Sequence, residues 1–516
     1  MAAVFLFAGI GQTRAAVINA TSGSFAAVSS AVASASPGDT IFIPAGTNIW
    51  TGKLNISGVT LQGFSSSSTV IVDESPPTGT GSPLIQINTT DNALTRLTQL
   101  QIVRGVTNTS PFQNYTGDIM VYGASPLFRI DHCQFTWLTG RPIHVGGGEN
   151  GLIDHCTFLM SNFSNCIEVD GAGTGDVSWA SPSTFGTSNA LYMEDNYIYS
   201  ANNFCAVDID FGGRGVMRHN TLLGSFFNTH GTETSLRYRS SRQFEIYNNT
   251  FNYGGGQQYN NFYTACDIRG GTGIVFSNTF VGFWSVANLN CYRATDNDQN
   301  FAPWFGATGL RAWDSNGPAL LTGNASADSA TSLIVTGAGW TSNQWLNCTV
   351  YNYNNSLCGV VTGNSADTMT FKTSRTPALQ ITFKQGDQFT VHRVYPLLDQ
   401  PGMGQGDLLT GDSPTPVWLH ETSEPLYFWG NSLSLMYQVP TAVSSKVGSN
   451  YPNIQENRDY FNDTPKPGYT PFIYPHPWTL MTNAVAGTNI VITLPTNTPP
   501  PVNTLAPPTG LTAHPL

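Results

Sequence analysis

Six short segments of this chain repeat one pattern, and this repeat limits the possible folds more than any other feature. Each segment has a Cys or Asn with an apolar residue three positions before it and another two positions after it. Successive Cys or Asn positions lie 23, 40, 24, 29 and 29 residues apart. Repeats of this length, built from short runs that alternate with period two, are typical of a β-solenoid. The segments are FRIDHCQF (128–135), GLIDHCTF (151–158), LYMEDNYI (191–198), GVMRHNTL (215–222), EIYNNTF (245–251) and IVFSNTF (274–280).

Solenoid rungs stack about 4.8 Å apart, so equivalent residues of successive rungs pile into columns. We therefore predict an inward column formed by Phe135, Phe158, Ile198, Leu222, Phe251 and Phe280. The Asn of each turn tolerates a left-handed conformation and can bond the Asn of the next rung, which predicts an asparagine ladder. The expected fold class is all-β: a right-handed parallel β-helix with a short N-terminal capping helix and a small inserted β-module.

Composition supports this prediction and excludes several classes of protein. Of the 516 residues 40% are hydrophobic, enough for a large core, and only 10% are charged, against about 25% in an average soluble protein. So few charges exclude coiled coils and helical bundles. The net charge of -11 argues against a nucleic-acid partner, and no apolar run is long enough to predict a membrane span. The apolar start (1–10) is read either as part of a secretory signal or as a disordered end; we expect a secreted, extracellular protein.

The beginning of the chain carries a resemblance to a known family. Residues 25–35 (FAAVSSAVASA) can form a short apolar helix, and PGDTIFIPAGT (37–47) leads into a strand. Together with the repeats, this arrangement resembles the amino-terminal cap of right-handed parallel β-helix proteins of the pectate-lyase-like superfamily. We expect a leader (1–20), the β-helix (21–317), the inserted module (318–393), the β-helix completion with a C-terminal cap (394–493) and a Pro-rich tail (494–516).

A second strand of each rung carries the candidate chemistry. In CIEVDG (166–171), AVDIDFGG (206–213), SLRYRSS (235–241) and CDIRGG (266–271), alternation points every second side chain outward. Oxygen ligands on adjacent rungs could bind calcium, and clustered carboxylates raise one another's pKa. The alternative is a solvated ladder of salt bridges. The outward candidates are Glu168, Asp170, Asp208 and Asp210 as calcium ligands, with Arg237, Arg239, Asp267, Arg269 and Tyr292 beyond them.

Cationic residues near these rungs could hold an acidic substrate. Six arginines stand against five acids from residue 208 to residue 269, so the local charge differs in sign from the total. His230, in NTHGTE (228–233), is the candidate proton carrier because the ordinary pKa of histidine lies near neutrality. The candidate substrate-binding residues are Arg214, Arg242, Asp267 and Tyr292. The two D-H-C repeats, with His132 and His155, could suggest a metal site, but we expect them to stack in the turn column.

The resemblance implies a carbohydrate-active protein. In pectate lyases, acidic residues of one sheet bind calcium and an arginine abstracts a proton. Carried over here, the acidic set would be Glu168, Asp170, Asp208 and Asp210, and the arginine would be Arg237, Arg239 or Arg269. Polygalacturonases pair Asp residues with a later His-Gly, similar to Asp208, Asp210 and His230, although their doubled Asp and Arg-x-Lys are absent here. We predict a lyase acting on an anionic polysaccharide. The alternatives are a hydrolase, an epimerase, and a non-catalytic glycan-binding or tailspike-like β-helix.

Overall fold

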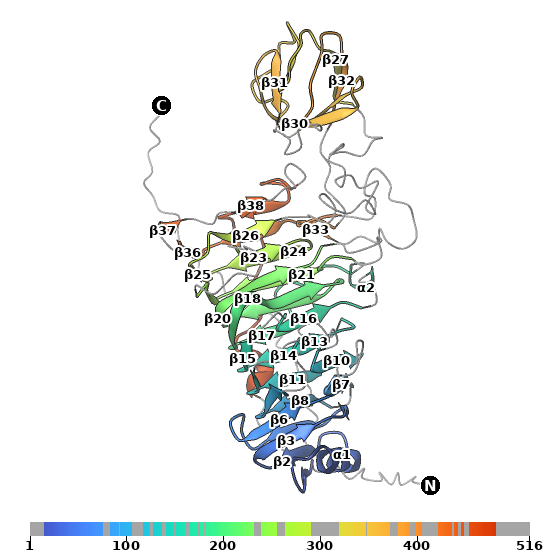
Figure 1. Cartoon of the computed structure of the whole chain (residues 1–516), viewed down its shortest axis with the longest axis vertical. Helices are drawn as coiled ribbons and strands as arrows, with labels where there is room; N and C mark the ends of the chain where they lie inside the picture. Colours follow the sequence, from blue (N-terminus) through green and yellow to red (C-terminus); the bar gives the residue numbers. More distant parts are fainter. Residues whose placement is uncertain are drawn as a thin grey trace, which may run out of the picture.

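Two long parallel sheets wind together into a coil that rises from the N-terminal end, as Figure 1 shows. The predicted right-handed parallel β-helix is confirmed. The computed structural model describes residues 15–75, 83–91, 93–105, 117–123, 127–136, 141–148, 150–160, 165–172, 176–179, 181–231, 239–254, 264–289, 319–346, 348–371, 380–392, 399–404, 422–435, 438–441, 445–447 and 454–480. The expected leader at the start and the Pro-rich tail lie wholly or largely outside these residues. Within them, no helix has the length and apolar character needed to cross a membrane.

One sheet has 12 strands, and among the described residues every neighbouring pair of its strands is parallel. The last two strands in its spatial order come from residues 426–462, so the chain returns to the β-helix after the small antiparallel sheet described below. In spatial order the strands are β1 (Val17–Asn19), β2 (Thr40–Ile43), β5 (Thr60–Gly63), β8 (Thr95–Thr98), β11 (Phe128–Asp131), β14 (Gly151–Asp154), β17 (Leu191–Glu194), β19 (Arg214–Arg218), β21 (Gln243–Tyr247), β24 (Thr272–Phe276), β35 (Leu426–Trp429) and β39 (Tyr460–Asn462).

The other sheet has 19 strands, arranged as two ladders. The long strands β18 (Tyr197–Asp210) and β20 (Thr221–Thr229) belong to both ladders and join them. The first ladder holds β3 (Gly46–Trp50), β6 (Thr69–Asp73), β9 (Gln101–Arg104), β12 (Gln134–Thr136), β15 (Thr157–Met160), β22 (Thr250–Asn252), β25 (Thr279–Val281), β36 (Ser432–Leu435) and the antiparallel β37 (Gln438–Thr441). The second holds β4 (Leu54–Ile56), β7 (Ile85–Thr89), β10 (Ile119–Gly123), β13 (Ile143–Val145), β16 (Ile167–Asp170), β23 (Thr264–Ile268), β26 (Ser285–Leu289) and β38 (Ser445–Val447).

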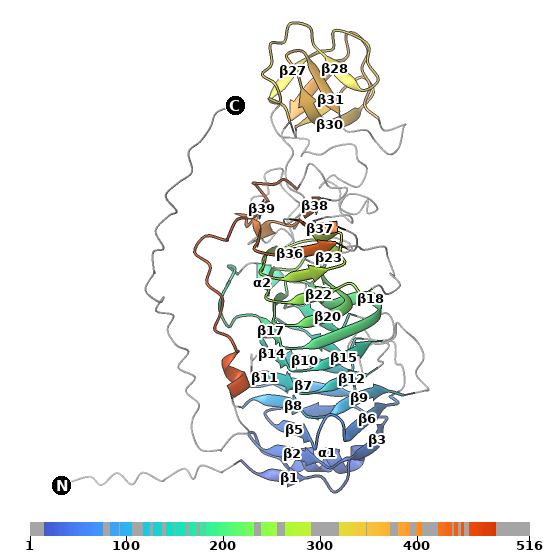
Figure 2. The ribbon, with the colours of Figure 1, turned by 90° about the vertical axis from the view of Figure 1, so that its left-hand side faces the viewer.

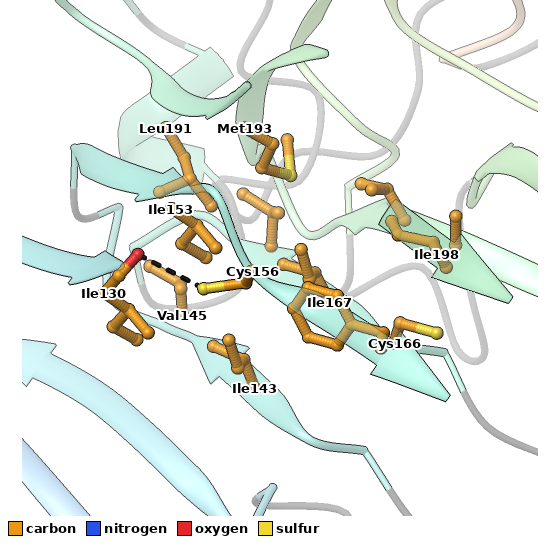
Figure 3. Close-up of a cluster of buried hydrophobic side chains, with 14 of the residues drawn as sticks. Ile130, Ile143, Val145, Ile153, Cys156, Cys166, Ile167, Leu191, Met193 and Ile198 are labelled. Atoms are coloured by element: carbon orange, nitrogen blue, oxygen red, sulfur yellow. Dashed lines mark hydrogen bonds between the residues drawn. The ribbon is translucent and has the colours of Figure 1, made fainter. Parts of the chain in front are cut away.

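The core lies inside the coil and is built from the columns that the repeat predicts. The first-ladder pairings stack the six predicted inward residues above one another, and all six are buried in the main hydrophobic cluster. Phe135 and Phe158 stack with ring centroids 4.8 Å apart, a distance that matches the rung spacing. Figure 3 shows part of this core, where Cys156 and Cys166 are free thiols packed among Ile, Val and Leu side chains.

The predicted asparagine ladder is present at the turns that follow β17, β19, β21, β24 and β35 of the 12-stranded sheet. The side-chain amide of each Asn donates to the side-chain oxygen of the Asn in the next rung, over 2.9–3.0 Å. The ladder consists of Asn196, Asn220, Asn249, Asn278 and Asn431. Each amide also donates to a backbone carbonyl, so polar groups buried in the turn stay paired.

Helix α1 (Phe25–Ser34) covers the N-terminal end of the coil, at the base of Figure 1. Ser24 caps it, because the Ser24 hydroxyl accepts from the backbone N–H of Ala27. Val28 and Ala31 face the first rungs and are buried. The helix thereby shields the apolar end of the solenoid from water, as a terminal cap must. The other short helical segments are α2 (Asp176–Trp179) and η5 (Pro477–Leu480).

A separate antiparallel sheet of six strands lies within residues 319–392 and has its own hydrophobic cluster, centred on Leu333, Val350 and Phe389. Its pairings are antiparallel, in contrast to those of the β-helix. Its strands, in spatial order, are β27 (Leu321–Asn324), β32 (Gln388–His392), β29 (Thr349–Asn352), β30 (Leu357–Asn364), β31 (Thr368–Phe371) and β28 (Ser332–Ile334). Two further short strands, β33 (Met403–Gly404) and β34 (Thr422–Ser423), pair antiparallel with each other.

Candidate active site

The outward side of the second ladder carries two rows of polar side chains. The first row contains residues that pair with one another on adjacent strands. The second row contains the residues that lie two positions later along the same strands. Their strand neighbours Ile167, Val207 and Ile268 lie in the core, so the predicted alternation is confirmed. We call Glu168, Asp170, Asp208 and Asp210 the carboxylate face. The first row runs through His144, Glu168, Asp208, Asn228 and Asp267, and the second pairs Asp170 with Asp210.

Asp208 is at the centre of the carboxylate face, and both of its oxygens accept hydrogen bonds. Its Oδ1 accepts from Asn228 Nδ2 at 2.7 Å and from His230 Nδ1 at 2.8 Å. Its Oδ2 accepts from Asn165 Nδ2 at 2.8 Å. Burial alone would raise the pKa of Asp208, but His230, with help from Arg269 and Arg141, outweighs burial and lowers that pKa. The group is therefore held as a carboxylate.

His230 lies at the end of β20, and its ring reaches back to the neighbouring rung. Besides the contact with Asp208, its Nδ1 lies 3.8 Å from Asp210 Oδ2. Burial and Arg269 disfavour the charged ring, but Asp208 and Asp210 outweigh them, so the pKa of His230 is raised. The side chain of His230 keeps 18% of its surface exposed, whereas that of Asp208 keeps 1%. The histidine can therefore meet a ligand while the aspartate stays behind it.

Asp210 differs from Asp208 although the two stand on the same strand. Burial, and then repulsion from Glu168, Asp208 and Asp170, raises the pKa of Asp210 well above its usual range, against the opposing effect of His230. The backbone N–H of Phe211 donates to its Oδ1 at 2.8 Å. One strand thus carries a carboxylate held ionised and a carboxyl group biased toward its protonated form, an arrangement typical of acid–base sites.

Glu168 is coupled to Asp208 through an asparagine that the sequence analysis missed. Asn165 Nδ2 donates to Glu168 Oε2 at 2.7 Å as well as to Asp208, and the Cys205 thiol donates to Asn165 Oδ1. Arg141 lies 3.0 Å from the other oxygen of Glu168. Burial raises the pKa of Glu168 to about 7 despite Arg141. An asparagine placed just before a predicted strand was the available signal for this role.

A second histidine–aspartate pair was also missed. His144 of β13 contacts Asp170 Oδ2 through its Nε2 at 2.7 Å. Burial opposes protonation of His144, but the contact with Asp170 outweighs burial and raises the pKa of the histidine. The same alternation applied to RPIHVGG (141–147) would have placed His144 in the first row, one rung before Glu168.

Asp267 and Arg269, both predicted on this face, belong to the rung that follows β20. Arg269 Nε donates to the backbone oxygen of Thr229 at 2.9 Å, and the guanidinium favours the ionised form of Asp208. Asp267 accepts from Asn288 Nδ2 at 2.9 Å and is buried. Arg269 therefore contributes positive charge to the carboxylate face, while Asp267 extends the first row away from His230.

Two predicted arginines, Arg239 and Arg242, do not lie on this face, and the outward placement expected for Arg239 was wrong. Arg239 is buried and forms a two-pronged ion pair with Asp399, with both bonds at 2.7 Å. Arg242 is buried and pairs with Glu424, with its shorter bond at 2.6 Å. Both guanidinium groups lie over the ring of Trp179. Both charges are therefore already paired, and the two ion pairs hold the segments near 399 and 424 against the β-helix.

Arg214 is also absent from the carboxylate face, because its strand, β19, belongs to the 12-stranded sheet. Its guanidinium donates to the carbonyl oxygens of Pro182, Ser178 and Ser181. Burial, with help from Arg242, lowers the pKa of Arg214 to about 10. The group therefore holds the loop that follows α2. The predicted candidates Arg237 and Tyr292 lie outside the described residues.

The carboxylate face is a poor match for a resident calcium ion. Calcium takes six to eight oxygen ligands, usually from unpaired carboxylates, carbonyls and water. Here both oxygens of Asp208 and both of Glu168 already face hydrogen-bond donors or Arg141. Within the described parts of the chain, no group of three or more His, Cys, Asp or Glu side chains is placed to hold a metal ion. We therefore derive no chemical step through calcium.

Comparison with known proteins gives no family. No protein-family model matches the chain, and no curated protein matches it significantly. Similar solved structures include a mutant of a PL6-family alginate lyase, at 16% identity and a TM-score of 0.33, over 53% of this chain and 38% of that one. A protein of Geobacillus virus E2 (ORF18) matches at 15% identity and 0.28, over 53% and 57%. The catalytic domain of a GH87 α-1,3-glucanase, a mutant in complex with tetrasaccharides, matches at 12% and 0.29, over 57% and 63%.

This chain thus spans less than two thirds of the length of each of these structures. At such low identities and TM-scores, the likenesses carry no argument about reaction or substrate. The fold follows from the strand pairings themselves, and any function must be argued from the side chains of the candidate active site.

Proposed function

We propose that this chain is a polysaccharide-cleaving enzyme in which the Asp208–His230 pair transfers the proton. The observation that carries the proposal is the 2.8 Å contact between His230 Nδ1 and Asp208 Oδ1. A carboxylate at one ring nitrogen orients the imidazole and stabilises its charged form, which is the arrangement that a histidine acid–base catalyst needs. His230 is also more exposed than the aspartate behind it.

We further propose β-elimination on an acidic, uronate-containing polysaccharide outside the cell. In that reaction a base takes the proton at C5, the C–H electrons form a C4–C5 double bond, and the bond from C4 to the glycosidic oxygen breaks. The leaving oxygen then takes a proton. His230 would take the C5 proton, and its resulting charge would be stabilised by Asp208. Arg141 and His144 would stabilise the substrate carboxylate, because Arg141 is cationic, the pKa of His144 is raised, and both lie near the partly exposed edge of the face.

Hydrolysis is the second candidate, and one observation favours it. Asp210, with its raised pKa, could act as general acid near the ionised Asp208. However, a hydrolase also needs a carboxylate that activates water. The oxygens of Asp208 already accept from Asn165, Asn228 and His230, so Asp208 would have to give up a bond to do so. This places β-elimination ahead.

The deciding experiment is incubation of the protein with pectate, alginate, glucuronan and neutral glycans. Ultraviolet absorbance from a new C=C bond reports β-elimination, whereas new reducing ends without absorbance report hydrolysis. We expect absorbance on an acidic glycan, and we expect His230→Gln to lower the rate about 10²- to 10⁴-fold. His219→Gln is the matched control, since His219 lies in a turn beside the 12-stranded sheet and stacks on Tyr474.

Other outcomes would overturn the proposal in defined ways. A changed configuration at C5 without cleavage would indicate an epimerase. Binding of a glycan with neither signal would favour a non-catalytic glycan-binding or tailspike-like protein. Full activity of His230→Gln would exclude the proposed role of the Asp208–His230 pair, whatever the reaction.

A further inference from the structure

The turns that follow β11 and β14 of the 12-stranded sheet carry two further histidine–aspartate contacts, whereas the candidate active site lies on the 19-stranded sheet. His132 follows β11 and His155 follows β14, and both have a left-handed backbone with φ of 53°. Their rings stack as predicted, with centroids 5.0 Å apart and an interplanar angle of 5°. About half of each side chain is exposed, 51% for His132 and 44% for His155.

Each ring is oriented by a carboxylate that is itself held in place. His132 Nδ1 lies 2.8 Å from Asp131 Oδ2, and His155 Nδ1 lies 2.8 Å from Asp154 Oδ2. Arg96 binds Asp131 through two bonds, of 2.6 and 2.7 Å. Arg129 binds Asp154 in the same way, at 2.8 and 2.7 Å. The two carboxylates are buried, so neither histidine can turn freely about its side chain.

These contacts determine which ring nitrogen of each histidine has a lone pair that can bind a ligand. Asp131 accepts two bonds from the Arg96 guanidinium and also lies 3.5 Å from Arg129, so this geometry identifies it as an ionised acceptor. A hydrogen bond to an ionised carboxylate requires Nδ1 to carry the proton. In the neutral ring Nε2 then carries the lone pair. Because both rings make the same Nδ1 contact and are nearly parallel, both Nε2 atoms are oriented the same way.

We propose that His132 and His155 form a two-imidazole binding site for a divalent first-row transition metal ion such as zinc. Metal-binding histidines characteristically donate their second ring N–H to a carboxylate, as both of these rings do. Imidazole nitrogen suits zinc, copper and nickel and does not suit calcium. Among the described residues no third His, Cys, Asp or Glu completes a metal-binding group, so water would fill the remaining coordination positions.

The spacing requires only a small adjustment of the rings. Two zinc–nitrogen bonds of about 2.0–2.1 Å at a tetrahedral angle span about 3.4 Å between the nitrogens. The rings stack 5.0 Å apart, so their outer edges must lean together by roughly 1.5 Å in all. The Nδ1 contacts lie on the inner edge of each ring and can act as pivots. Neighbouring rungs therefore present the two ligands close to, although not yet at, the bound distance.

The neighbouring turn residues supply conservative substitutions. Register places Gln99 at the same turn position one rung before His132, and Gln99 also adopts a left-handed backbone, with φ of 58°. Glutamine is therefore compatible with this turn but removes the imidazole. His219 occupies a turn two rungs beyond His155 and is covered by the ring of Tyr474, 3.7 Å away. It is the matched histidine that lies outside the proposed pair.

The test is calorimetric titration of the full chain with zinc chloride at pH 8, with circular dichroism of each variant to verify the fold. We expect one zinc ion per chain, at least a ten-fold loss of affinity in both His132→Gln and His155→Gln, and unchanged affinity in His219→Gln. Imidazole NMR should show the largest zinc-induced shifts at the Nε2 atoms of His132 and His155. Absence of zinc binding would overturn the proposal. So would binding that survives either of the two substitutions, because a single imidazole or another site would then account for it.

Discussion

His230 Nδ1 lies 2.8 Å from Asp208 Oδ1, across the boundary between β20 and β18. This contact joins the predicted proton carrier to a carboxylate that Asn165 and Asn228 hold from two further directions. The pKa of His230, the stability of the fold and calcium binding at the carboxylate face can each be tested without knowledge of the substrate.

The first prediction concerns the titration of His230. In Asp208→Asn, the pKa of His230 should fall, because the carboxylate that stabilises its charged form is gone while burial and Arg269 remain. Imidazole NMR titration measures this pKa directly. Asp267→Asn, on the rung at the other side of β20 and bonded there to Asn288, should leave it unchanged. An equal fall in both variants, or no fall in Asp208→Asn, would contradict the assigned pairing.

The second prediction concerns the pH dependence of stability. Burial raises the pKa of Glu168 to about 7, above the ordinary value of about 4.3. A pKa raised in the folded state gives stability that is complete below the unfolded pKa and is lost as the pH rises through the folded pKa. Between about pH 5 and about pH 8, the unfolding free energy should fall by about 2 kcal/mol more in the natural protein than in Glu168→Gln.

Urea unfolding at several pH values measures this difference between the two proteins. Parallel pH dependence of the natural protein and Glu168→Gln would contradict the raised pKa of Glu168. Asp328→Asn serves as the control, because Asp328 is exposed and pairs with Lys384 on the small antiparallel sheet. The pH dependence of its unfolding free energy should show no such difference from the natural protein.

The third prediction concerns the asparagine ladder. Asn249→Ala should destabilise the fold by about 2–4 kcal/mol, because it leaves several buried partners without their hydrogen bonds. Asn249 donates to the carbonyl oxygens of Met217 and Tyr247 and to Asn278, and it accepts from Asn220. Thermal or urea unfolding measures the loss. Asn55→Ala, at an exposed position of β4, should cost little, and an equal cost for both would argue against the ladder as a source of stability.

The fourth prediction concerns residues 464–480, which run along the outer side of the 12-stranded sheet in Figure 2. Arg218 donates to the carbonyl oxygens of Phe472 and Ile473 in this segment. Tyr469 donates to the buried Glu245 at 2.6 Å, whereas the exposed Tyr474 donates to Asp195 at 2.8 Å. Tyr469→Phe should therefore cost about 1–3 kcal/mol and Tyr474→Phe less than about 0.5 kcal/mol. Equal costs in unfolding measurements would count against a structural role for the segment.

The fifth prediction concerns calcium at the carboxylate face. Because Asp208 and Glu168 are already satisfied by donors, calorimetry should detect no calcium binding to the protein alone. The calcium ligands predicted from the sequence are tested further by repeating the titration with an oligouronate, whose carboxylates could supply additional oxygen ligands. Tight binding of calcium without the glycan would show that the donors around these carboxylates exchange readily for metal.

Much of the fold follows from local patterns, because the pairing of stacked rungs repeats the same short-range rule. The inward column from Phe135 to Phe280 and the asparagine ladder from Asn196 to Asn278 were predictable. Alternation likewise placed Glu168 and Asp208 side by side. Each of these features needs only the strand period and the rung spacing, both of which are visible in the chain itself.

The sequence by itself thus determined the coil, its core columns and the row of carboxylates, because a repeat specifies the contacts between neighbours. Only the tertiary structure decided which charges remain near those carboxylates. Arg239 pairs with Asp399, 160 residues away, and Arg242 with Glu424, 182 residues away, and no period of the chain encodes either contact. A charged side chain that is buried away from water needs a partner of opposite charge. That partner can come from any part of the chain that folding brings close. Arg239 and Arg242 therefore stabilise distant segments, while Asn165, Arg141 and His144 surround the carboxylate face.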